Sequence, residues 1–222
     1  MTRKLALAAV STLGLLGVPL GAQAAQIVLF GTAGGITLTG TGATATVNVT
    51  IANGTGDGAS FQSPGFPNEN GTYTLGAATF SAGPQTPAGS GIFPATGANT
   101  ESFSYLGADA DSLTGTITWN LLQDGTNNPK FFGTMHVNTS SGDAQFTGAF
   151  IPGSNGPIDF TTSGLPGGGT LDALAASTAT VTVGISSGEV VPGPIVGAGL
   201  PGLVAACGGL LALARRRRKQ TA

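Results

Sequence analysis

The stretch LTGTITWNL at residues 113–121 decides the fold of this 222-residue chain. Its residues alternate between two sides: Leu113, Gly115, Ile117, Trp119 and Leu121 against Thr114, Thr116, Thr118 and Asn120. A period of two is typical of an antiparallel strand that buries one face. We therefore predict a half-buried strand here, with Trp119 in the core rather than on a sugar-binding surface.

The same alternation occurs on both sides of this stretch. Residues 44–52 (TATVNVTIA) place Ala45, Val47, Val49 and Ile51 on one face, and residues 178–185 repeat the pattern. We expect further strands at 26–30, 35–40, 72–81, 101–106 and 158–162, and a meander formed by 113–122, 130–138 and 144–151. The only helix we expect in this region is a short turn at 171–176, and the Gly-rich segments 54–71 and 83–99 are predicted to be loops.

These patterns predict a single all-β domain over residues 25–190, built as an antiparallel β-sandwich or a jelly roll. The composition agrees, because 41% of the residues are hydrophobic, 38 are Gly and one is Cys. A disulfide framework is therefore excluded. The region from residue 25 to 194 holds one basic residue, Lys130, against ten acidic ones, so we expect no nucleic-acid partner.

The first 24 residues have the parts of a secretory signal peptide. Arg3 and Lys4 precede an uncharged apolar run at residues 5–16, and Ala22 and Ala24 supply the small residues that signal peptidase requires before its cleavage site. We therefore predict a signal helix in residues 1–24 that exports the chain. An uncleaved anchor is the alternative, and the shortness of the run argues against it.

A second apolar segment lies near the C-terminus. Residues 195–214 carry no charge, and as a helix they would span about 30 Å, the thickness of a bilayer core. The basic cluster that follows is Arg215, Arg216, Arg217, Arg218 and Lys219. Because such clusters stay in the cytoplasm, we predict a transmembrane helix that anchors the chain transiently in the inner membrane, with residues 25–190 outside the cytoplasm.

The motif VPGP, formed by Val191, Pro192, Gly193 and Pro194, directly precedes this helix. Its two prolines favour an extended backbone, which suits a peptidase cleft. A proline motif, an apolar helix and an Arg-rich end in this order resemble the PEP-CTERM sorting signal. The usual motif of that family is Val-Pro-Glu-Pro, and this chain resembles a variant with Gly193 in place of Glu. The resemblance covers residues 191–219.

The resemblance implies a sorting route. Proteins with this signal are exported by Gram-negative bacteria that make extracellular polysaccharide. An exosortase-type membrane peptidase recognises the motif and removes the tail, and the passenger reaches the cell surface or the extracellular matrix. The four motif residues would then be substrate residues. A plain C-terminal anchor with a Pro-rich hinge is the alternative.

The predicted domain offers no recognisable catalytic set. It has one histidine, His136, no cysteine and no Gly-x-Ser-x-Gly motif, so we expect neither an enzyme nor a metal site. The turns at 109–111 (DAD) and 124–128 (DGTNN) are rich in oxygen ligands that could serve calcium. Neither has EF-hand spacing, and we favour ordinary turn chemistry and no cofactor.

These observations favour a non-enzymatic exported protein of the cell surface or the exopolysaccharide matrix, with a structural or adhesive β domain. The first alternative is a carbohydrate-binding module, because uncharged Thr-rich faces could meet hydrated glycans. A secreted hydrolase that uses His136 is the second alternative. The sequence does not identify a ligand for any of the three.

Overall fold

The computed structural model describes residues 25–31, 35–63, 67–125 and 128–192. Eight antiparallel strands form a closed ring in the order β9-β10-β11-β13-β1-β4-β5-β8, and β8 pairs back with β9. They are β1 (Gln26–Phe30), β4 (Gly54–Gln62), β5 (Glu69–Leu75), β8 (Thr100–Gly107), β9 (Ser112–Gln123), β10 (Lys130–Ser141), β11 (Asn155–Thr162) and β13 (Ile185–Val190). The all-β prediction is confirmed. The ring closes into a barrel, where we expected a sandwich or a jelly roll.

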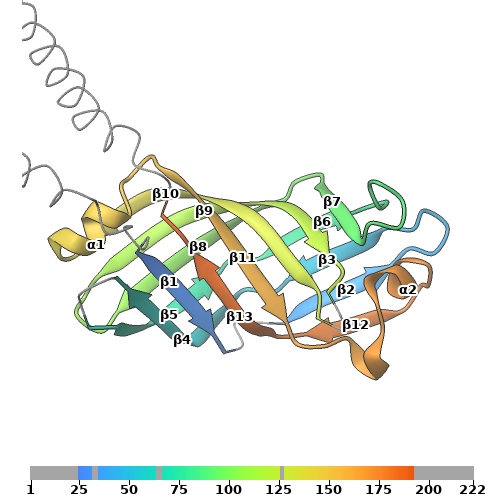
Figure 1. The fold of residues 1–222 in the computed structure, drawn as a ribbon, viewed down its shortest axis with the longest axis horizontal. Coiled ribbons are helices and arrows are strands. Elements are labelled where there is room, and N and C mark those ends of the chain that lie inside the picture. The colour runs from blue at the N-terminus through green and yellow to red at the C-terminus, as the bar shows by residue number, and fades with distance from the viewer. Residues whose placement is uncertain (1–24, 32–34, 64–66, 126–127, 193–222) are drawn as a thin grey trace, which may run out of the picture.

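Five more strands extend from the far end of β9. They are β2 (Ile36–Gly40), β3 (Val47–Ile51), β6 (Ala78–Ala82), β7 (Ile92–Thr96) and β12 (Thr180–Val183). In Figure 1 this extension forms the half of the molecule that carries α2 (Leu171–Ala175). β7 pairs with the last residues of β9, and β12 runs through Gly184 directly into β13 of the barrel. One continuous core therefore links the two halves.

The predicted alternation places the core correctly along most of β9. Trp119 is fully buried, with its ring centroid 5.1 Å from that of Phe160 and 5.7 Å from that of Phe131. The alternation shifts near the end of the strand, where Leu122 is buried in place of Leu121. A bulge opposite Phe132 and Gly133 causes the shift, because it adds one residue to β9 and inverts the faces beyond it.

Strand β4 lies in a segment that its composition predicts to be a loop. Its glycines face aromatic rings of neighbouring strands: the ring of Tyr73 covers Gly56, and the ring of Phe30 covers Gly58. A Cβ atom at either position would overlap the ring. These glycines therefore make room for packing within a sheet. The second predicted loop, 83–99, likewise contains β7.

Two short helices lie at opposite ends of the molecule (Figure 1). Helix α1 (Ala144–Ala149) replaces the third strand of the predicted meander, so that prediction is wrong and β10 pairs with β11 instead. Phe146 and Phe150 are four residues apart and both are buried, which is helical spacing. Helix α2 confirms the predicted helical turn, and a short 3₁₀ turn, η1 (Pro166–Gly168), precedes it.

No helix within the described ranges is both long and apolar enough to cross a bilayer. The predicted signal helix (1–24) and the predicted transmembrane helix (195–214) lie outside those ranges. Both remain predictions from the sequence.

Candidate metal centre

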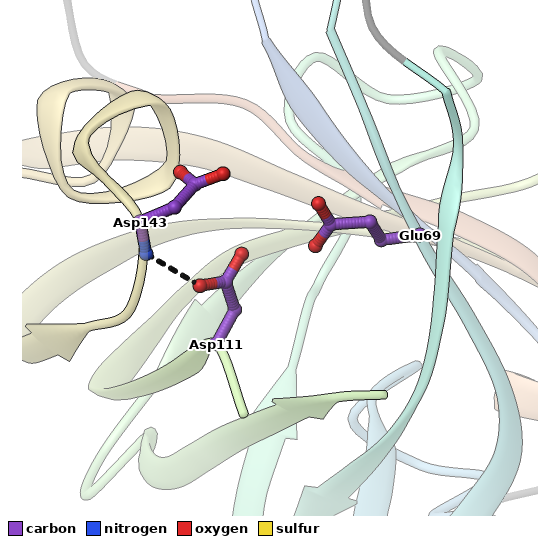
Figure 2. Close-up of side chains that lie close together, drawn as sticks. All are labelled: Glu69, Asp111 and Asp143. Atoms are coloured by element: carbon purple, nitrogen blue, oxygen red, sulfur yellow. Dashed lines mark hydrogen bonds between the residues drawn. The ribbon is translucent and has the colours of Figure 1, made fainter. Parts of the chain in front are cut away.

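Three carboxylates converge at the α1 end of the barrel (Figure 2). Glu69 begins β5, Asp111 directly precedes β9, and Asp143 follows β10 and caps α1. One oxygen from each of the three lies within 4.8 Å of the others. The first and last of them are 74 residues apart along the chain (143 − 69), and the three meet because β5, β8, β9 and β10 are successive strands of the ring.

Asp111 is the buried member of this cluster, with 1% of its surface exposed. Its Oδ1 accepts a hydrogen bond of 2.8 Å from the backbone N–H of Asp143. Its Oδ2 is buried and receives no hydrogen bond from any described residue, and Oε2 of Glu69 is in the same condition. Buried carboxylate oxygens normally have donors, so an ionised pair here is incompletely satisfied.

The backbone around Asp111 is shaped to accommodate its carboxylate. Gly142 has a φ of +134°, and a Cβ atom there would overlap the Asp111 carboxylate. Glycine at this position therefore allows the N–H of Asp143 to reach Oδ1 of Asp111. On the other side, the N–H of Gly107 donates to the carbonyl of Asp111 at 2.7 Å and closes the turn between β8 and β9.

Ionisation of all three carboxylates at once is unfavourable, because they are close together and partly buried. Burial, hydrogen bonding to Asp111 when one carboxyl is protonated, and repulsion from Asp111, Asp109 and Asp143 raise the pKa of Glu69 to about 7. No described residue brings a compensating charge, because Lys130 is the one Lys or Arg in the described ranges. Lys130 and Ser141 are the two ends of β10, and at about 3.3 Å per residue they are roughly 36 Å apart.

The ligand atoms at this cluster are all carboxylate oxygens, which suit a hard cation such as calcium. The turn at 109–111 therefore contributes Asp111 to the candidate cation site, whereas Asp109 is exposed and is not one of the three. In the other oxygen-rich turn, Asp124 has a structural role, since its Oδ1 accepts a hydrogen bond of 3.1 Å from the N–H of Leu171 in α2. Two members of the cluster, Glu69 in the predicted loop 54–71 and Asp143, carry no signal in the sequence that marks them as ligands.

Besides Asp111, one more acidic side chain of the described ranges is buried, and it lies inside the barrel. Glu101 is 3% exposed, and its Oε2 accepts a hydrogen bond of 2.8 Å from Nε1 of Trp119. Burial raises the pKa of Glu101 to about 8, and the Trp119 hydrogen bond opposes this only in part. The sequence gives no sign of this pair beyond the inward position of Trp119.

A shallow groove of about 550 Å³ lies on the outer face of β9, β10, β11 and β13. Residues of its lining include Asn120, Phe132, Thr134, Asn155, Asp159 and Val191. Phe132 is half-buried, and Nδ2 of Asn120 donates to Oγ1 of Thr134 at 3.0 Å. The groove therefore combines an aromatic surface with amide, hydroxyl and carboxylate groups. It shares no residue with the acidic cluster.

The other residues singled out from the sequence fall in different places. His136 is exposed, with Nδ1 at 2.8 Å from Oδ1 of Asn155. The N–H of Val191 donates to the carbonyl of Pro157 at 3.0 Å, so the first residue of the sorting motif is held beside β11. Several predicted residues lie outside the described ranges: Ala22, Ala24, Gly193, Pro194, Arg215, Arg216, Arg217, Arg218 and Lys219.

Comparison with known proteins identifies no relative of this chain. No family model matches it, and neither does any curated protein or solved structure.

Proposed function

We propose that this chain is an exported, non-enzymatic protein of the cell surface or extracellular matrix, sorted by its C-terminal signal. The proposal rests on the order of the sequence features: a signal peptide, an acidic domain without cysteine, the VPGP motif, an apolar segment and a basic end. An exosortase-type membrane peptidase is the partner in this account, and the inner membrane holds the precursor before the tail is removed.

The position of Val191 supports this division of the chain. Strand β13 ends at Val190 after pairing with both β1 and β11, so the barrel is complete at the residue before the motif. Cleavage within or after the motif would remove no residue of the barrel strands. A tail that contributed a strand to the barrel could not be removed in this way.

Mass spectrometry of the exported protein tests the proposal. The expected mature form begins at Ala25 and lacks every peptide beyond the motif. Replacing Pro192 and Pro194 by Ala is expected to leave the chain anchored, whereas the same change at Pro152, on an exposed turn of the domain, is expected to leave export unchanged. A mature extracellular form that retains residues 195–219 would contradict the proposal.

The groove favours one second candidate, a carbohydrate-binding domain. Sugars bind through a partly exposed aromatic face together with planar amide and carboxylate groups, and Phe132, Asn120 and Asp159 supply these. An exopolysaccharide would be the ligand. Pull-down on polysaccharide columns is expected to retain the wild-type chain and to lose the Phe132→Ala variant. The exposed control Thr55→Val, on β4, is expected to be retained. Absence of retention on every glycan would reject this candidate.

A further inference from the structure

The acidic cluster is a set of ligands that the proposed function does not use. Its three carboxylates come from three separate segments: the start of β5, the turn before β9 and the cap of α1. Figure 2 shows Glu69 and Asp111 directed toward each other, with Asp143 beside them. Without a cation between them, three negative charges in this arrangement repel one another.

We propose that Glu69, Asp111 and Asp143 form a calcium site that joins α1 to the barrel. The inference goes beyond the proposed function and does not depend on how the chain is sorted. Calcium takes oxygen ligands at about 2.3–2.6 Å, so two oxygens on one ion can be up to about 5 Å apart. The three carboxylates satisfy this condition, because their ligand atoms all lie within 4.8 Å of one another.

The buried oxygen of Asp111 is the independent observation that points to a ligand. Asp111 is 99% buried (100 − 1), and its Oδ2 faces the cluster without a donor from any described residue. The fold places it there by means of Gly142, whose φ of +134° is strained for other residues. A carboxylate held in this way is costly unless a cation or a proton satisfies it.

The ligand types favour calcium over other metals. The cluster contains no nitrogen or sulfur ligand, which disfavours zinc and copper. Magnesium requires a near-ideal octahedron, whereas calcium accepts an irregular set of about six to eight oxygens. Asp143 is exposed, so water can reach the cluster and complete the coordination. Its Oδ1 caps α1, which leaves the second oxygen of this carboxylate for the ion.

Bound calcium would fix the position of α1. Asp143 accepts hydrogen bonds from the N–H groups of Gln145 and Phe146, so an ion held by Asp143 also holds the first turn of the helix. With three carboxylate ligands and the rest water, we expect an affinity in the range of extracellular calcium modules, with a Kd of about 10⁻⁴ to 10⁻³ M.

Calorimetric titration of the full chain in mild detergent with calcium chloride tests the site. We expect saturable binding of one ion, and weaker binding of magnesium. At ten times the Kd, calcium is expected to raise the Tm by about 3–6 °C. Glu69→Gln and Asp111→Asn are expected to weaken binding about tenfold or more, since each removes a charged ligand. Asp172→Asn, the same change on the exposed face of α2, is expected to bind as the wild type does.

Glu69→Gln also separates calcium from a proton shared between Glu69 and Asp111. The amide of Gln can donate to Oδ2 of Asp111, so this variant is expected to fold without calcium and to lose the calcium-dependent rise in Tm. Terbium supplies a second readout, because the hydroxyl of Tyr105 lies 3.4 Å from the carbonyl of Glu69 and can sensitise terbium luminescence. Tyr105→Phe should reduce that luminescence and leave calcium affinity unchanged.

Two results would overturn the proposal. The first is a wild-type chain that shows neither binding heat nor a Tm shift with calcium. In that case a shared proton satisfies Asp111. The second is binding that keeps its affinity in both Glu69→Gln and Asp111→Asn, which would place the ion elsewhere.

Discussion

The two ends of the molecule each carry a short helix with a side-chain N-cap, but among the described residues only the α1 end also has a cluster of carboxylates. At each end a short helix is capped by the residue before it, Asp143 for α1 and Thr170 for α2. At the α2 end the acidic side chain of Asp124 is not part of a carboxylate cluster within the described ranges. Its Oδ1 accepts a hydrogen bond from the backbone N–H of Leu171. At the α1 end Asp111 and Glu69 approach Asp143 and keep buried oxygens without donors.

This difference in unsatisfied carboxylate oxygens favours a ligand-binding role for the α1 end and a purely structural role for the α2 end. At the α2 end, protein side chains accept the hydrogen bonds of the backbone N–H groups at the start of the helix. The α1 end has the same cap together with a charge cluster that the protein does not neutralise. We therefore treat the α2 end as the reference for each test of the α1 end.

The largest effect is expected from removing the buried anchor of each helix. Phe146 packs its ring 5.0 Å from Phe61 and 5.2 Å from Phe150, so Phe146→Ala should lower the free energy of unfolding by about 3–5 kcal/mol. Leu171→Ala at α2 should cost about 2–5 kcal/mol. Chemical denaturation measures both. A loss below about 1 kcal/mol for Phe146→Ala would show that α1 is not part of the core.

Glu101 contributes a pH dependence that belongs to neither end. Its pKa is about 8 in the folded state against 4.5 in the unfolded state. As the pH rises through this window the unfolded chain loses the proton first, so the stability of the fold falls, and it levels off above about pH 8. Glu101→Gln should remove a loss of about 4–5 kcal/mol between pH 4.5 and 8, because the two pKa values differ by 3.5 (8 − 4.5) and each pKa unit corresponds to about 1.4 kcal/mol.

The measurement for Glu101 is the Tm as a function of pH for wild type and Glu101→Gln. Trp119 can still donate to the amide oxygen, so the variant keeps the interior contact. Parallel pH profiles for the two proteins would contradict the assignment. In the Glu101→Gln background the pH dependence due to Glu101 is absent, so the Tm values of variants at the α1 and α2 ends can be compared directly.

A smaller effect is expected from glycines at the two ends. Gly142 and Gly167 both have positive φ, +134° and +72°, but only Gly142 has a carboxylate where a Cβ would lie. Gly167→Ala should cost about 1 kcal/mol from backbone strain alone. Gly142→Ala should cost about 2–3 kcal/mol and should also weaken calcium binding. Equal costs and unchanged calcium binding would argue against the role given to Gly142.

The smallest change in stability is expected from removing the N-cap side chain of α1 or of α2. Removal of either cap, in Asp143→Ala or Thr170→Ala, normally costs about 0.5–2 kcal/mol. In the presence of a calcium chelator Asp143→Ala should cost less than Thr170→Ala, because it also relieves repulsion from Glu69 and Asp111. With calcium the order should reverse. Tm values of both variants in both buffers decide this, and an order that does not change would contradict the account.

The sequence predicts the strands that alternate and misses those that carry glycine. The predicted strands 26–30, 101–106 and 113–122 lie close to β1, β8 and β9, because one face of each is buried. The composition of β4 predicts a loop, because Gly56 and Gly58 make room for rings of other strands, and no local sequence pattern reveals those rings. Residues 144–151 looked like a strand, although Phe146 and Phe150 have helical spacing.

The candidate site could be predicted only in part. The oxygen-rich turn at 109–111 is recognisable in the sequence, and its residue Asp111 is a member of the cluster. Glu69 and Asp143 lie 42 residues before Asp111 (111 − 69) and 32 after it (143 − 111), in segments with no metal-ligand spacing. Closure of the barrel brings them together, and closure depends on the order of the strands in the sheet, which no local sequence pattern determines.

Hydrogen exchange of the full chain with and without calcium compares α1 and α2 in a single experiment and so shows whether calcium stabilises α1 alone. Amides of Ala144–Ala149 in α1 are expected to become more protected when calcium is added, while those of Leu171–Ala175 in α2 stay unchanged. The Asp111→Asn variant should lose the difference. Equal protection of α1 with and without calcium, or an equal change in both helices, would contradict the account.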